Sequence, residues 1–277
     1  MLDPMLLLAI DTCGPSGSVA LGRLTGQKIE ILGQIELEGR SYSATLVAAV
    51  GELLTRVGIA VRELGAIVVV NGPGSFTGVR VGLSAAKGLC EAAGIRLAVA
   101  SRLEVLAAKA GVPGDGSLSQ GWQTGVPGDG SLSQGWQTGV PGDGSLSRGW
   151  QAGAMGAALD AHRQEVFLRI GEASGEIREL LAGEAELAAI GPEWKGRPGL
   201  QPARIAVCDE AAAELLGRAW PAAELVRTDA PTAADALEVC WARVAAGEFA
   251  DVALLDGHYL RRSDAEIFGA TAGAQRV

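Results

Sequence analysis

Short apolar runs that suit buried strands come first along the chain. Residues 5–10 are wholly apolar and end at Asp11-Thr12, residues 18–23 form a second run, and residues 28–37 carry isoleucines at intervals. The turn formers Gly14-Pro15-Ser16-Gly17 separate the first two runs, a pattern typical of a hairpin. We therefore predict three antiparallel strands at the start of the chain.

A helical period replaces this pattern at residues 42–57. Apolar side chains recur three or four positions apart and form one face, namely Leu46, Val50, Leu53, Leu54 and Val57. Beyond it we predict a buried strand over 65–70, a helix over 79–94, a strand over 96–100 and a short helix capped by Ser101. Antiparallel strands followed by alternating helices and strands predict a mixed α/β sheet.

The last part of the chain starts again with a hairpin. We predict strands over 156–160, 165–170 and 204–208, and helices over 210–216 and 233–246. Residues 171–203 are expected to form loops and one short helix. Residues 259–262 suit either a charged edge strand or an anion site at their two arginines, and we expect a loose tail beyond Ile267.

An insertion divides the chain into a first domain of residues 1–110 and a second, smaller domain of residues 153–277. Residues 111–152 are one 14-residue unit written three times, the third copy differing only at Arg148 and Ala152. The unit consists mostly of turn formers and carries one Trp per copy. We predict a mobile surface loop whose deletion leaves activity intact.

Composition narrows the class of protein. Hydrophobic residues make up 48% of the chain and charged residues 20%, which allows a substantial core. The net charge of −9 argues against the chain gripping a nucleic-acid backbone alone. Two histidines and four widely spaced cysteines cannot build a multi-His metal centre, and we find no signal peptide or membrane span. These features predict a cytoplasmic protein.

A glycine-rich turn, residues 71–80, connects the predicted strand 65–70 to the following helix. Gly72, Gly74 and Gly78 permit close approaches that a Cβ would forbid, Pro73 stiffens the turn, and Ser75 and Thr77 can cap the helix. Two interpretations remain open: an anion or partner site at the helix N-terminus, and a tight connection without a ligand. The turn matches neither the dinucleotide-binding pattern nor the Lys-bearing P-loop.

Asp11 and Thr12 end the first strand directly before a turn and are the candidates for a position near a nucleotide. In phosphotransferase-like folds a carboxylate at this place can hold hydrated magnesium while the turn cradles phosphate. The alternative is an Asp that satisfies the amides of its own turn.

Several motifs together resemble the TsaB (YeaZ) family. They are Leu8–Thr12, Gly72–Arg80, Ser101–Leu106, Ala158–Val166 and Tyr259–Arg261, in family order. The family is a subunit of the bacterial machinery that makes threonylcarbamoyladenosine in tRNA. The resemblance implies an α/β fold of the actin/Hsp70 (ASKHA) type, with two ribonuclease-H-like domains and mixed sheets, the second domain being reduced.

The resemblance also implies a role without catalysis. The related catalytic subunit, TsaD, binds its metal through a His-x-x-x-His pair whose aligned positions here are Arg102 and Leu106. A guanidinium repels a metal cation and Leu has no donor atom. The implied role is that of a scaffold that binds and orders TsaD for transfer of threonylcarbamoyl to the adenosine next to the anticodon, and that lets the ATPase TsaE dock.

Partners and cofactors follow from the same resemblance. It implies contact with tRNA only through the complex, self-association in isolation, no membrane, no cofactor of its own, and a place for ATP or ADP only at the interface with partner subunits. We predict that the partner contacts Leu46, Val50, Leu53, Phe76, Arg80, Gly82, Leu83 and Ala86, so that Leu46→Asp blocks pairing. The alternative is that these helix faces cover their own sheet.

Two rival functions remain. One is a nucleotide-dependent phosphotransferase or peptidase of the same fold, which predicts ATP turnover that Asp11→Ala abolishes. The other is a self-contained homodimeric binding module.

Overall fold

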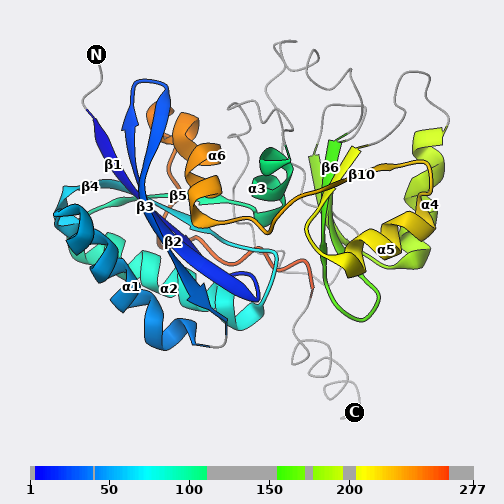
Figure 1. Cartoon of the computed structure of the whole chain (residues 1–277), viewed down its shortest axis with the longest axis horizontal. Coiled ribbons are helices and arrows are strands. Elements are labelled where there is room, and N and C mark those ends of the chain that lie inside the picture. The colour runs from blue at the N-terminus through cyan, green and yellow to red at the C-terminus, as the bar shows by residue number, and fades with distance from the viewer. Residues whose placement is uncertain (1–3, 40, 111–154, 172–176, 196–203, 262–277) are drawn as a thin grey trace, which may run out of the picture.

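Two five-stranded sheets, one from each half of the chain, form the framework (Figure 1). The computed structural model describes residues 4–39, 41–110, 155–171, 177–195 and 204–261. The predictions for the repeats at 111–152 and for the tail beyond residue 261 lie outside these ranges.

The first sheet has the order β3-β2-β1-β4-β5. Its hairpin strands β1 (Met5–Asp11), β2 (Ser16–Thr25) and β3 (Lys28–Glu38) are antiparallel, and β4 (Leu64–Val70) and β5 (Arg96–Ala100) continue parallel to β1. All five strands were predicted. The turn formers and the β-branched apolar runs were sufficient to place them.

The second sheet repeats this topology in the order β10-β9-β6-β7-β8. β6 (Met155–Asp160), β7 (Val166–Gly171) and β8 (Ile177–Ala182) are antiparallel, and β9 (Arg204–Val207) and β10 (Glu224–Arg227) continue parallel to β6. The prediction missed β8 and β10. Both are short outer strands that contain charged residues. Their pattern of polar and apolar residues is therefore the same as that of many loops.

In the described ranges, seven helical segments connect the strands. They are α1 (Tyr42–Val57), the 3-10 turn η1 (Val61–Glu63), α2 (Phe76–Ala93), α3 (Arg102–Lys109), α4 (Glu184–Lys195), α5 (Glu210–Ala219) and α6 (Ala233–Ala246). Capping side chains start several of them: Ser101 accepts from the Leu103 amide and Thr232 from the Asp235 amide. None of these helices is long and apolar enough to cross a membrane.

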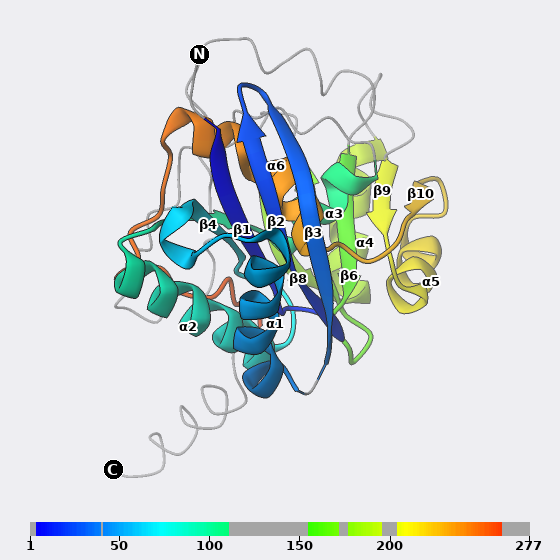
Figure 2. The same cartoon turned by 60° about the vertical axis from the view of Figure 1, so that its left-hand side comes forward.

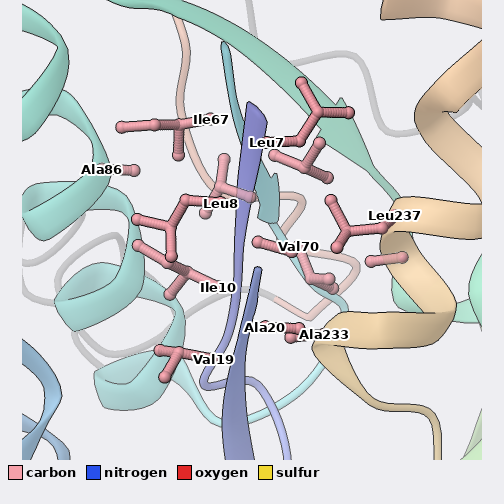
Figure 3. Packing of buried hydrophobic residues seen from close by; sticks show 14 of the residues in the cluster. Leu7, Leu8, Ile10, Val19, Ala20, Ile67, Val70, Ala86, Ala233 and Leu237 are labelled. Carbon is pink, nitrogen blue, oxygen red and sulfur yellow. The ribbon is translucent and has the colours of Figure 1, made fainter. Parts of the chain in front are cut away.

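The central strands of the first sheet are buried on both faces. Figure 3 shows Leu8 and Ile10 of β1 pointing toward α2, near Ala86, while Leu7 lies on the side of α6, near Leu237. These residues belong to one buried cluster, in which both Leu7 and Leu8 have no exposed surface. The period-2 alternation of a strand therefore supplies apolar side chains to two helical layers. The continuous apolar run seen in the sequence reflects this double burial.

The two halves exchange a helix. α3 follows the last strand of the first sheet but packs against β6, β7 and β9 of the second, whereas α6 follows the last strand of the second sheet and covers the first (Figures 1 and 2). α3 and α6 also pack against each other. We assigned residues 153–277 to the second domain, yet α6 and the segment after it complete the core of the first. The chain thus crosses the junction twice.

Candidate functional site

The end of β1 packs directly against the start of α2. The Thr12 hydroxyl donates a hydrogen bond of 2.6 Å to the Gly78 carbonyl. A Cβ on Gly78 would lie 2.0 Å from the Thr12 carbonyl oxygen, and one on Gly82 would lie 2.4 Å from the Thr12 hydroxyl. These two glycines are therefore required for contact within the chain, which the tight-connection interpretation of the glycine loop describes.

The glycine loop itself is anchored to the turn that follows β1. The Ser75 amide donates to the Cys13 carbonyl at 2.8 Å, and the Ser75 hydroxyl caps α2 by accepting from the Gly78 amide at 3.3 Å. Gly72 has φ 116, which favours glycine, and the Gly72-Pro73 peptide bond is cis. Thr77 lies in the first turn of α2 with its side chain exposed, so Ser75 alone is the cap. The loop fixes where α2 leaves the sheet.

Asp11 forms a buried ion pair with Arg102. The Arg102 Nε lies 3.6 Å from Asp11 Oδ2, and the two side chains are 6% and 2% exposed. Asp11 Oδ1 accepts a hydrogen bond of 2.8 Å from the Cys13 amide, as the alternative interpretation of a turn-satisfying Asp predicts. The Arg102 guanidinium thus lies beside the Asp11 carboxylate, which one of our two interpretations assigned to a magnesium ion.

Neither position aligned with the metal ligands of TsaD suits a metal here. Arg102 is paired with Asp11, and Leu106 is fully buried in a cluster with Phe167 and Ala206 of the second half. The described ranges contain no group of three or more His, Cys, Asp and Glu side chains that could hold a metal ion. The residues at this end of β1 therefore support charge pairing and packing.

A second buried carboxylate, Glu179 on β8, joins the halves and was missed by the sequence interpretation. It accepts from the Ser101 hydroxyl at 2.7 Å and lies 2.8 Å from His258 Nε2, while Arg169 on β7 forms an ion pair with it. Burial raises the pKa of Glu179, but the Arg169 charge and the bonds from His258 and Ser101 outweigh it and lower the pKa to about 2. Glu179 is thus a charged link between three parts of the chain.

An aromatic cluster covers the start of α2. The Phe76 ring packs against Tyr259 with centroids 4.9 Å apart, and the Arg80 guanidinium lies 3.8 Å from the Phe76 centroid. Phe76 is 37% exposed. Tyr259 therefore belongs to a surface cluster. The described residues 259–261 form no strand, which corrects the edge-strand interpretation for this part of the segment.

Most of the predicted partner contacts are buried in the chain's own core, and this corrects the prediction. Those with side chains are at most 5% exposed, namely Leu46, Val50, Leu53, Leu83 and Ala86, and Gly82 faces Thr12. The apolar face of α1 covers its own sheet, as the alternative stated. Leu46→Asp would consequently disturb the core. Only Phe76 and Arg80 of the predicted set are exposed.

Part of the outward surface of α1 and α2 instead carries small residues. Val47 on α1 is 71% exposed, and Ala44, Ala48 and Gly51 beside it are exposed as well. On α2, Gly88 is exposed, and a Cβ on Gly51 or Gly88 would meet no atom within 4 Å. The two helices pack against each other on one side of the first sheet (Figure 2). We name this surface, from Ala44 to Gly51 and at Gly88, the small-residue face.

A family model and several known proteins match part of the chain in sequence. The family model TsaD, described as tRNA N6-adenosine threonylcarbamoyltransferase, matches residues 31–119. The tRNA threonylcarbamoyladenosine biosynthesis protein TsaB of Bacillus subtilis (strain 168) is 38% identical over 104 residues, covering 38% of this chain and 44% of that protein. The protein of the same name from Haemophilus influenzae is 36% identical over 106 residues, covering 38% and 43%. The matched region spans less than half the length of these curated relatives.

Solved structures match nearly the whole chain in fold. An uncharacterized protein with similarity to peptidase YEAZ from Pseudomonas aeruginosa has a TM-score of 0.61 at 22% identity, over 93% of this chain and 100% of that one. YeaZ from the same organism has a TM-score of 0.56 at 23% identity, over 91% and 99%. These likenesses show a shared fold, and the two mixed sheets with their helices confirm the predicted α/β class.

Proposed function

We propose that this chain, part of which matches proteins named TsaB in sequence, is a non-catalytic subunit in the biosynthesis of threonylcarbamoyladenosine in tRNA. In this role it binds a TsaD-type catalytic subunit and orders it for transfer of threonylcarbamoyl to the adenosine next to the anticodon. A TsaE-type ATPase docks on the resulting complex in the cytoplasm. The observation that carries the proposal is the sequence match, over 104 and 106 residues, to two proteins named TsaB.

The chemistry around Asp11 supports a role without catalysis. A carboxylate that holds a metal must leave oxygen atoms free for it, whereas Asp11 accepts from the Cys13 amide and is paired with Arg102. Replacing a neutral imidazole by a guanidinium also places a positive charge where a cation would bind. The proposal therefore assigns no metal and no cofactor to this chain itself, and it assigns ATP or ADP to the interface with partners.

The small-residue face supports a docking role for α1 and α2. A glycine inside a helix costs about 0.5–1 kcal/mol relative to alanine, and neither Gly51 nor Gly88 relieves a contact within the chain. Small exposed residues on two adjacent helices let other helices approach closely. The exposed Val47 on α1 adds apolar surface to the same face. We therefore assign the TsaD-type partner to this face.

Reconstitution tests the proposed function. The chain is combined with TsaD-type and TsaE-type proteins, threonylcarbamoyl-adenylate and unmodified tRNA, and modified adenosine is measured in digested tRNA. We expect modification only in the complete mixture. Equal modification without this chain would refute the scaffold role, and modification by this chain without the TsaD-type protein would assign catalysis to it.

A variant of the docking face connects this function to the structure. Val47→Asp places a charge at a 71%-exposed position and should leave the fold intact. We expect it to lower both complex formation and tRNA modification. The matched control is Ala211→Asp, an exposed position on α5 of the second half. Wild-type complex formation by Val47→Asp would exclude the small-residue face as the docking site.

A further inference from the structure

Residues 250–261 follow α6 and run from the first half of the chain to the second (Figure 1). We name this segment the strap. At its start the Ala250 amide donates to the Leu97 carbonyl of β5 at 2.8 Å, and Leu255, 7% exposed, belongs to the core of the first half. At its end Leu260 packs against the cluster that α3 forms with the second sheet. The strap therefore links the halves in addition to the exchanged helices α3 and α6.

His258 is the residue at which the strap changes sides. Its backbone amide donates to the carbonyl of Asn71, directly after β4, at 2.7 Å. Its ring Nε2 lies 2.8 Å from Glu179 Oε2 on β8, and both side chains are at most 9% exposed. One residue thus holds the first half with its backbone and the second half with its side chain.

Arg261 fastens the far end of the strap to the turn after β6. Its guanidinium forms an ion pair with the Glu165 carboxylate, and Nη2 also donates to the His162 carbonyl at 3.4 Å. The Arg261 and Glu165 side chains are 24% and 33% exposed, so water weakens this ion pair. The far anchor of the strap is therefore weaker than the buried one at His258.

The strap also covers the start of α2. The Tyr259 ring lies with its centroid 4.9 Å from that of Phe76, and the Arg80 guanidinium lies 6.0 Å from the Tyr259 centroid. Phe76 is 37% exposed even with Tyr259 in place. Departure of the strap would therefore uncover more of the Phe76 ring.

Two buried polar atoms where the strap lies on the first half have no hydrogen-bond partner in the described ranges. They are Asn71 Oδ1 and the Tyr259 hydroxyl. Water would reach both atoms if the strap left its place, so these unsatisfied groups raise the free energy of the bound strap relative to the released one. Specific anchors combined with such a penalty are expected of an element that opens without global unfolding.

We propose that the strap is a releasable latch between the two halves. When it is bound, it fixes the second sheet to the end of β4 and to the start of α2. When it is released, it separates His258 from Glu179 and uncovers Phe76, while both sheets stay folded. The latch is a property of the chain alone and does not depend on the proposed function.

Native-state hydrogen exchange on the full-length chain tests the latch. Deuterium uptake is measured by mass spectrometry in peptides that cover the strap and β1, and urea unfolding under the same conditions gives the global stability. The loosening variant is Arg261→Gln, which removes the ion pair with Glu165. The tightening variant is Tyr259→Phe, which removes the unsatisfied hydroxyl.

Two control variants separate release of the strap from global unfolding. Gly82→Ala perturbs the contact of α2 with Thr12, which stays formed when the strap is released. It should speed exchange in β1 and leave exchange in the strap unchanged. Arg227→Gln removes an exposed ion pair with Glu210 in the second half, away from the strap, and should also leave strap exchange unchanged.

We expect the strap of the wild type to exchange about a hundredfold faster than β1. Arg261→Gln should speed strap exchange roughly tenfold, and Tyr259→Phe should slow it roughly fivefold. Exchange of the strap at the rate of β1 would show that it opens only with the whole fold, and would overturn the proposal. Equal acceleration of the strap and β1 by Gly82→Ala, or strap exchange that neither Arg261→Gln nor Tyr259→Phe changes, would overturn it as well.

Discussion

Replacing the two glycines of the small-residue face with larger residues should stabilise the isolated chain and weaken its binding to the partner. Gly51 and Gly88 lie inside α1 and α2, are exposed, and have no atom of the chain near the position that a Cβ would occupy. In the double variant Gly51→Gln/Gly88→Gln, each substitution should stabilise its helix by about 0.5–1 kcal/mol, because glutamine is a good helix former. A midpoint rise of roughly 2–4 °C per kcal/mol then follows.

The same side chains should weaken docking on the small-residue face. A bulky group inserted at a close helix contact costs about 1–3 kcal/mol, which is roughly 5- to 150-fold in Kd. Thermal unfolding of the isolated chain measures the first effect, and calorimetric titration with the TsaD-type partner measures the second. A loss of binding caused by misfolding would come with a lower unfolding midpoint. A loss of binding caused by blocked docking would come with a higher midpoint.

Gly217 on α5 provides the matched control. It is also an exposed helical glycine with no atom near its Cβ position, but it lies on the second half. Gly217→Gln should raise the midpoint and leave association unchanged. The reasoning fails if the double variant binds the partner as tightly as the wild type, or if Gly217→Gln weakens binding equally.

Three further predictions concern the interior. Folding lowers the pKa of Glu179 from 4.5 to about 2, so the charged Glu179 stabilises the wild type above pH 4.5, and this stability is lost as the pH falls toward 2. In urea unfolding, Glu179→Gln should therefore be less stable than the wild type by roughly 3 kcal/mol at pH 7, and the difference should shrink as the pH is lowered. A difference in unfolding free energy that does not depend on pH would contradict this. Gly82→Ala should destabilise the chain by about 1–3 kcal/mol, because its Cβ would meet the Thr12 hydroxyl; an unchanged midpoint in thermal unfolding would count against that contact. Tyr259→Phe should keep or raise the midpoint by the equivalent of about 1 kcal/mol, because the Tyr259 hydroxyl is buried without a partner in the described ranges, and a lower midpoint would reveal a bond to that hydroxyl.

Local patterns predicted the first sheet and its helices well because each signal lies within a few residues. The apolar run at 5–10, the turn at Gly14-Pro15 and the glycine that ends α2 at Gly94 each specify one element. The outer strands β8 and β10 were missed because charged residues occupy positions that a buried strand would fill with apolar ones. Glu179 could not be identified, because its partners Ser101 and His258 are far away in sequence.

The helical period identified the buried face of α1 but could not tell which face a partner uses. Leu46 and Leu53 repeat at the spacing of a core face, and they are core residues. The exposed face at Val47 and Gly51 gives a weak signal, since small residues on a helix are common. Gly51 is the unusual feature of α1, because it is a helical glycine with no atom of the chain near the position of a Cβ.

The exchange of α3 and α6 has a consequence for synthesis on the ribosome. The first sheet is complete in sequence once β5 has been made, yet the face that includes Leu7 stays open to water until α6 emerges. Domains that carry all their own helices can finish folding from the N-terminus as they are made, and this one cannot. A nascent chain that ends before residue 246 should therefore expose an apolar surface to chaperones, and the two halves should reach their native state together after the chain is released.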